Sequence, residues 1–187
     1  KVNFGIELPR LKEIASKFEK NHDVAQALWK ENIRECKIVA GLLQPIDTFY
    51  PDIADIWVED MRYPEIAELT VMNLFQHLPY ASEKAFEWIA REEPYFQFCG
   101  YMLVARLLMK YGELNERAEN ELLDQVVPAL SGESGFVFRA ASTALRKYAS
   151  QSKENARKVR GVLISLPSSE RPEVLSLLEE TKILTES

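Results

Sequence analysis

Two glutamates near the start of an expected helix are the residues best suited to do chemistry. Glu65 and Glu68 follow Pro64 in the stretch EDMRYPEIAELTVMNLFQHL, residues 59–78. A carboxylate can act as a general acid or base, and it can stabilise positive charge that develops in a transition state. Acidic residues in the first turn of a helix also interact favourably with the helix dipole, by about 0.3–1 kcal/mol. Glu65 and Glu68 are therefore the candidate catalytic residues, and an ordinary acidic helix start is the alternative.

Metal and cofactor chemistry has few suitable residues in this sequence. The chain has two histidines, His22 and His77, and two cysteines, Cys36 and Cys99, which lie far apart and form no Cys-x-x-Cys pair. Metal sites in proteins usually need several closely spaced His and Cys ligands. We predict no metal site and no cofactor, and we expect both cysteines to be buried thiols.

Basic residues are concentrated late in the chain, although the whole chain carries a net charge of -6. Residues 135–160 contain seven basic residues and one acidic residue, whereas residues 47–68 contain seven acidic residues and one basic residue. Arg139 and Arg146 are seven positions apart, so they share a helix face with Thr143 between them. Such a face can bind the phosphates of a nucleic-acid backbone, and a solvated basic face is the alternative. The candidate nucleic-acid-binding residues are Tyr63, Arg139, Thr143, Arg146, Lys147, Arg157 and Lys158.

Tyr63 is included because of its place beside a helix start. It precedes Pro64, so it is the aromatic residue that we most expect to be exposed in a binding groove. Trp29, Trp57 and Trp88 lie instead within amphipathic helical patterns, which favours packing over base stacking.

Apolar residues recur with the period of an α-helix along the chain, and no stretch alternates as a strand would. The expected helices cover residues 9–20, 22–30, 32–43, 51–61, 64–78, 81–91, 95–111, 115–130, 136–150, 153–165 and 170–183. The expected N-cap residues are Asn21, Asn32, Asn115 and Ser169. Short connections predict helical hairpins stacked as in a solenoid, in one domain over residues 1–187, and a compact bundle is the alternative.

No apolar segment is long enough to span a membrane, and no secretory signal is visible. A cytoplasmic protein without membrane contact is therefore expected. The chain begins with Lys1 rather than Met, so an N-terminal element before it can be missing.

Three segments carry a resemblance to a known family. FGIELPRLKEIASKF and AQALWKENIRECKIVAGLL open the chain, WVEDMRYPEIAELTVMNLF follows, and FRAASTALRKYAS lies near the end. In this order they resemble the bacterial DNA alkylation-repair family, the AlkD-like HEAT-repeat proteins. The matching residues in the first two segments are Gly5, Pro9, Leu11, Ile14, Ala15, Leu28, Trp29 and Glu35.

The resemblance covers residues 4–165 and implies both a fold and a function. The implied fold is all-α, with HEAT-like repeats stacked as a curved right-handed solenoid whose basic concave face binds DNA. The implied chemistry is hydrolysis of the N-glycosidic bond of an alkylated purine, in which a carboxylate stabilises oxocarbenium-like charge.

The family's catalytic positions are not matched in this chain. The family opens its active helix with Trp-Asp and places the catalytic Asp one turn later, where this chain has Tyr63, Pro64 and then Ala67. Glu68 comes one residue late, which rotates it by about 100° around a helix. The family's concave arginine falls at Gln97 or Phe98, and its second concave tryptophan falls at Thr143.

The sequence therefore predicts a DNA-binding role in the repair of base damage, with double-stranded or damaged DNA as the partner. If the chain is an enzyme, it is an alkylpurine DNA glycosylase. The alternative is a helical-repeat scaffold without enzymatic activity that binds a protein on its concave surface, and the acidic net charge favours this alternative.

Overall fold

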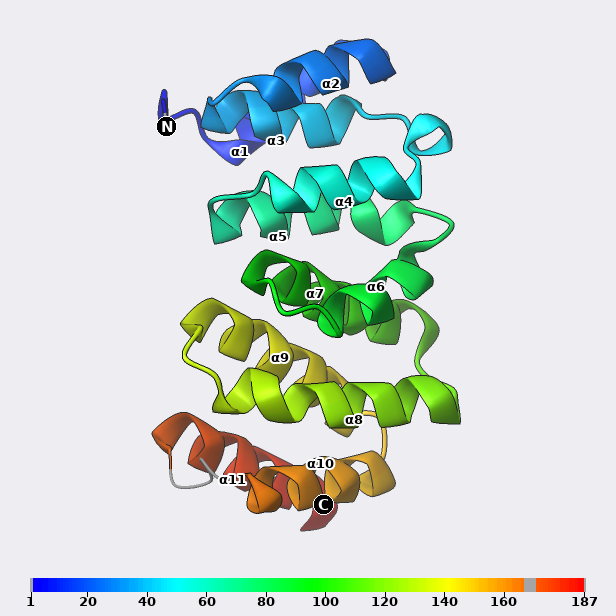
Figure 1. Ribbon diagram of the computed structural model, residues 1–187, viewed down its shortest axis with the longest axis vertical. Helices are drawn as coiled ribbons and strands as arrows, with labels where there is room; N and C mark the ends of the chain where they lie inside the picture. The colour runs from blue at the N-terminus through cyan, green and yellow to red at the C-terminus, as the bar shows by residue number, and fades with distance from the viewer. Residues whose placement is uncertain (1, 167–170, 187) are drawn as a thin grey trace. The chain divides into compact units, whose positions relative to one another are not determined.

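The computed structural model describes residues 2–166 and 171–186, and Figure 1 shows the order of its helices. Within these residues there are eleven α-helices, two short 3₁₀-helices and no β-strand, apart from one bridge between Val2 and Ile33. The prediction of an all-α fold is confirmed. Residues 1–81 and 82–187 form two compact units, and the prediction of one domain over 1–187 stays a prediction.

The first unit contains five α-helices and both 3₁₀-helices. They are α1 (Leu8–Ala15), α2 (His22–Lys30), α3 (Arg34–Leu43), η1 (Ile46–Thr48), α4 (Pro51–Glu59), α5 (Pro64–Asn73) and η2 (Phe75–His77). Asn21 caps α2 as predicted, because its side chain accepts a hydrogen bond from the backbone N–H of Val24 at 3.0 Å. Pro51 and Pro64 are the first residues of α4 and α5, where the missing N–H has no helical partner to lose.

Three details of the predicted helices are corrected in the first unit. The helix expected over 9–20 ends at Ala15, and the exposed Phe18 beyond it has no core to cover. The helix expected over 64–78 ends at Asn73, since Leu74 leaves the helical conformation and η2 follows. Asn32 is not an N-cap, because its carbonyl accepts a hydrogen bond from the N–H of Val2 and α3 begins two residues later.

The core of the first unit is built around two stacked tryptophans. The rings of Trp29 and Trp57 lie 3.9 Å apart and 5° from parallel, and Phe49 meets the edge of Trp57 at 4.8 Å. The indole N–H of Trp57 donates to Gln26, so the polar atom of this buried ring is satisfied. Both tryptophans are buried, as is Trp88 in the second unit, which agrees with the packing role expected from their helical spacing.

The second unit contains the remaining six helices. They are α6 (Ala81–Ile89), α7 (Pro94–Tyr111), α8 (Glu116–Ser131), α9 (Gly135–Ala149), α10 (Lys153–Ser165) and α11 (Pro172–Glu186). Asn115 caps α8 as predicted, whereas Ser169 lies outside the described residues. Helix α9 packs against α7, α8, α10 and α11, and α10 packs against α11. The face that α9 turns away from this core can therefore carry polar residues.

Helices α6 and α7 approach each other closely at Gly100. A Cβ atom at this position would lie 2.7 Å from the side chain and backbone of Ile89 and 2.9 Å from the carbonyl oxygen of Ala85. Only glycine fits without moving one helix. The neighbouring Cys99 is fully buried as predicted, but Cys36 is only partly buried, so the prediction of two buried thiols is correct for one of them. None of the described helices is long and apolar enough to cross a membrane.

Candidate nucleic-acid interface

Helices α9 and α11 border a groove with a volume of about 640 Å³. Its polar lining consists of Arg139, Ser142, Thr143 and Arg146 from α9, with Arg171, Glu173 and Ser176 from the start of α11. The α9 residues meet at one surface because positions three and four apart on a helix are neighbours. Three arginines and a single carboxylate among the lining residues make the groove electropositive.

Arg139 is the most accessible cation of this groove. Its side chain is exposed, and its guanidinium makes no hydrogen bond or ion pair with any residue that the structure describes. The adjacent Thr143 hydroxyl donates to the carbonyl oxygen of Arg139 at 2.8 Å, so it is already engaged with its own helix. Ser142 is 2% exposed and therefore offers little to a ligand, whereas the Arg139 guanidinium is accessible.

Arg146 is held by a carboxylate from α11. Its Nε atom donates to Glu180 Oε2 at 2.6 Å and its Nη2 atom to Oε1 at 3.1 Å, and the Ser176 hydroxyl also donates to Oε1 at 3.3 Å. The hydrogen bonds from Arg146 hold the pKa of the Glu180 carboxyl below its usual value. Both side chains are nearly half exposed, so an anion in the groove can compete with Glu180 for the guanidinium.

Arg171 completes the arginine cluster from the other side of the groove. Its Nη1 atom donates to the carbonyl oxygens of Leu130 and Gly132 at 3.2 and 3.3 Å, and its guanidinium lies 5.3 Å from the ring of Phe138. These contacts fix the direction of the side chain. Among the residues that the structure describes, none accepts a hydrogen bond from its other guanidinium nitrogens.

The other predicted basic residues lie outside this groove. Lys147 is exposed and lines a neighbouring, mainly apolar hollow of about 440 Å³. On α10, Arg157 pairs with Glu154 at 3.7 Å, and Lys158 donates to Glu119 of α8 at 2.6 Å. That hydrogen bond raises the pKa of Lys158. The structure thus brings together Arg139, Thr143 and Arg146, places Lys147 in the adjoining hollow that Thr143 and Arg146 also line, and places Arg157 and Lys158 on α10 outside both.

Tyr63 lies in the first unit, where it lines a cavity of about 220 Å³. Its side chain is 41% exposed, in agreement with the exposure expected from its position before Pro64. The polar residues that share this cavity are Lys30, Asn32, Arg34, Lys37, Asp60 and Arg62.

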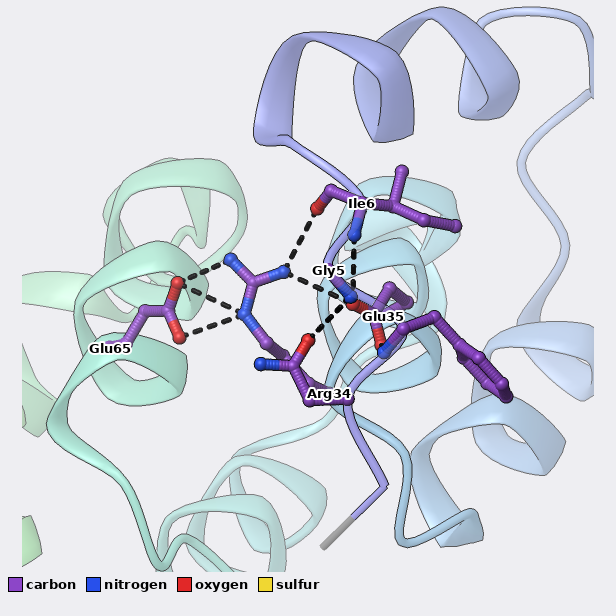
Figure 2. Close-up of polar contacts among 7 residues, drawn as sticks. Gly5, Ile6, Arg34, Glu35 and Glu65 are labelled. Atoms are coloured by element: carbon purple, nitrogen blue, oxygen red, sulfur yellow. Dashed lines mark hydrogen bonds and ion pairs between the residues drawn. The ribbon is translucent and has the colours of Figure 1, made fainter.

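Glu65 is engaged in a salt bridge rather than open to a ligand. Figure 2 shows Arg34 of α3 between Glu65 of α5 and the N-terminal segment at Ile6. Arg34 Nε donates to both carboxylate oxygens of Glu65, at 3.1 and 2.9 Å, and Nη2 donates to the same group. Arg34 Nη1 donates to the carbonyl oxygen of Ile6 at 3.1 Å and to Glu35 at 3.4 Å.

Glu68 and Ala67 lie on different sides of α5. Ala67 is fully buried, whereas Glu68 is exposed and makes no hydrogen bond or ion pair with the residues that the structure describes. A carboxylate at position 68 instead of 67 therefore points away from the core of the first unit, because successive residues on a helix are rotated by about 100°. No group of three His, Cys, Asp or Glu residues in the described part of the chain is placed to hold a metal ion.

The family model described as DNA alkylation repair enzyme matches residues 1–160. The chain belongs to this family. One solved structure of similar fold is described as "A new family of proteins related to the HEAT-like repeat DNA glycosylases with affinity for branched DNA structures". It superposes with a TM-score of 0.75 and 18% sequence identity, covering 86% of this chain and 69% of that chain. The predicted HEAT-like repeat fold is thereby confirmed, and no curated protein matches the chain.

In this member of the DNA alkylation repair family, the sequence pattern did not point to Arg171 or to a cluster of three basic residues near α3. Arg171 was not selected because it stands alone before Pro172, beyond the basic run that ends at Arg160. Three basic residues within positions 30–37 were also not selected, although their spacing places Arg34 and Lys37 on one side of α3. That spacing is the signal that could have found them.

Proposed function

We propose that this DNA alkylation repair family member binds DNA through the α9–α11 groove and acts in base-damage repair. The observation that carries the proposal is the exposed Arg139 guanidinium, which lies in one groove with Arg146 and Arg171. Guanidinium groups are well suited to phosphate because their planar N–H donors match its oxygens. The similar structure with affinity for branched DNA supports this choice of ligand.

The chemistry of the groove favours recognition of the DNA backbone rather than of base sequence. Contacts to phosphates fix position and orientation and carry no direct sequence information. A protein that uses such contacts distinguishes DNA molecules by the path of the backbone. We therefore propose that distorted or branched duplexes are preferred as ligands over straight duplexes. The cytoplasmic location expected from the sequence stays a prediction.

The salt dependence of DNA affinity tests this proposal. Fluorescence anisotropy of a labelled straight duplex and a labelled four-way junction would give the dissociation constant at about 50 mM and about 200 mM salt. If the three groove arginines contact phosphates, affinity should fall roughly 40-fold over this range. No measurable affinity at low salt, or an affinity independent of salt, would contradict the proposal.

A protein-binding scaffold is the second candidate, and the net charge of -6 favours it because a chain of negative net charge repels a polyanion. The same salt titration distinguishes DNA binding from protein binding. A folded chain with no affinity for either DNA would leave protein binding as the better reading.

Alkylpurine hydrolysis through α5 is a narrower proposal, in which Glu68 is the carboxylate of choice. Glu65 is bound by Arg34, whereas Glu68 is exposed three residues farther along α5. If methylated purines are released from treated DNA, Glu68→Gln should lower the rate at least about tenfold, as for loss of a general acid or base. Glu65→Gln should act mainly on stability. Release that is absent, or unchanged by both substitutions, would remove both glutamates from any catalytic role.

A further inference from the structure

The cavity of the first unit gathers cations from three separate segments. Lys30 is the last residue of α2, Arg34 and Lys37 lie one turn apart on α3, and Arg62 lies between α4 and α5. Asp60 is the one carboxylate among the described residues that line the cavity, and Glu65 pairs with Arg34 of the same cavity. Four cations stand against Asp60 and against Glu65, which pairs with Arg34, so positive charge remains in excess at this concave site and makes it a candidate anion site within a chain of net charge -6.

The deeper cations of this cavity are held in place by carboxylates. The side chains of Arg34 and Lys37 are 13% and 14% exposed, and they pair with Glu65 and Asp60. Lys37 Nζ lies 2.5 Å from Asp60 Oδ2, donates to the carbonyl oxygen of Trp29 at 2.7 Å and lies 4.4 Å from the centre of the Trp29 ring. These contacts fix two positive charges at the base of the cavity.

The outer cations keep most of their donors available. Lys30 is exposed, and its ammonium group makes no hydrogen bond or ion pair with the residues that the structure describes. Arg62 is also exposed, and within the described part of the chain only its Nη1 atom donates, to the carbonyl oxygens of Glu59 and Met61 at 2.6 and 2.8 Å. The partly exposed Tyr63 ring borders the same space.

We propose that this cavity binds a phosphate monoester that is attached to a nucleoside, such as the 5′-phosphate end of a DNA strand or a nucleoside monophosphate. A monoester carries about -1.5 to -2 charges near neutral pH, more than a phosphodiester, so it gains more from Lys30 and Arg62, which pair with no carboxylate among the described residues. The space of about 220 Å³ admits a terminal phosphate, whereas an internal phosphodiester is flanked by two sugars. The Tyr63 ring can stack on the attached base, as aromatic residues do in proteins that bind single strands.

This site is separate from the α9–α11 groove and goes beyond the proposed function. The groove is suited to the continuous backbone of a duplex, whereas the cavity is suited to an end. A nick or a strand break presents such an end during the repair of damaged DNA. The proposal therefore predicts a preference that the groove residues do not control.

A comparison of 5′-phosphorylated and 5′-hydroxyl strands tests the proposal. Two single strands of about ten nucleotides, labelled at the 3′ end and identical apart from the 5′ group, would be titrated with the full chain. We expect the phosphorylated strand to bind about tenfold more tightly, since charge-assisted hydrogen bonds are roughly twice as strong as neutral ones. Equal affinities would overturn the proposal.

Substitutions separate the cavity from other basic surfaces. Lys30→Ala with Arg62→Ala should reduce the preference to less than about twofold, and Lys30→Ala alone should reduce it in part. Lys12→Ala is the matched control, because Lys12 of α1 is exposed and lies outside the cavity. A preference that survives the double substitution overturns the assignment to this cavity. Arg139→Glu with Arg146→Glu should lower overall DNA affinity and leave the preference intact, so failure of either proposal is visible separately.

Competition distinguishes the two sources of the monoester and tests Tyr63. Thymidine 5′-monophosphate is titrated against the bound phosphorylated strand. Displacement at nucleotide concentrations close to the dissociation constant of the strand supports a free nucleotide as ligand. Displacement only at much higher concentrations supports a strand end. Tyr63→Ala should weaken nucleotide binding about 5- to 100-fold through loss of stacking. Inorganic phosphate that competes as well as the nucleotide would overturn the role of Tyr63.

Discussion

Reversal of charge at Arg139 and Arg146 together is expected to lower DNA affinity by at least about 100-fold at low salt, because two charge-assisted phosphate contacts are lost. The wild-type groove offers one guanidinium without a partner in the described residues and one shared with Glu180. In the double variant both positions repel phosphate. The measurement is the dissociation constant for the four-way junction, by anisotropy, beside thermal unfolding of the same samples.

Two further variants test whether the loss of affinity comes from the groove. Arg117→Glu on α8 makes the charge change of a single groove substitution, such as Arg139→Glu, at an exposed position outside the groove, and it should change affinity by less than about threefold. Glu180→Gln should raise affinity about two- to fivefold, because Arg146 no longer pairs with a carboxylate. Equal losses of affinity in Arg117→Glu and in Arg139→Glu alone would show that net charge governs binding.

The placement of Arg139 beside Arg146 could be predicted because it depends only on local geometry. Residues seven apart on a helix share a face in any helical protein, and the period of α9 is clear in the sequence. The part played by Arg171 could not be predicted in the same way. It depends on the packing of α11 against α9 and on the carbonyl groups at the end of α8, which are set by contacts between residues about 40 positions apart.

The helices show the same division between local and distant causes. Pro64 at a helix start and Asn21 as an N-cap are local signals, and both predictions are confirmed. The end of α5 at Asn73 could not be read from the apolar run through Leu78, because that run continues into the 3₁₀-helix that buries Phe75. Asn32 resembles an N-cap in the sequence, but its backbone pairs with Val2.

The role of Glu65 depended on a partner 31 positions away. Its place in the first turn of α5 suggested a candidate acid, and nothing in that stretch indicates Arg34. A carboxylate that accepts hydrogen bonds from both Nε and Nη2 of an arginine has limited freedom to move toward a substrate. The structure therefore assigns Glu65 a part in the cohesion of the first unit.

Arg34→Ala is expected to lower the free energy of unfolding by about 3 kcal/mol, the lower end of the range for breaking a largely buried ion pair. Arg34 is 13% exposed at its side chain and joins the N-terminal segment, α3 and α5 through Ile6, Glu35 and Glu65. Its removal leaves the buried Glu35 carboxylate, among the described residues, with backbone donors alone: the N–H groups of Phe4 and Ile6 at 3.2 and 3.3 Å and its own N–H. Glu65 is nearly half exposed and can return to water, so Glu35 accounts for most of the loss.

Acidic pH should reduce the difference in the free energy of unfolding between wild type and Arg34→Ala. Burial alone would raise the pKa of Glu35, but hydrogen bonds from the backbone N–H groups of Glu35, Phe4 and Ile6 and from Arg34 hold it below its ordinary value of about 4.5. A carboxyl whose pKa is lower in the folded state stabilises the protein above its unfolded-state pKa, and this contribution is lost as pH falls. Urea unfolding of wild type and Arg34→Ala at pH 7 and below pH 4.5 measures the difference in unfolding free energy at each pH.

Arg10→Ala is the control, since Arg10 and Glu13 form an exposed ion pair worth less than about 1 kcal/mol. An Arg34→Ala loss no larger than that of Arg10→Ala would show that the N-terminal segment is held by other contacts.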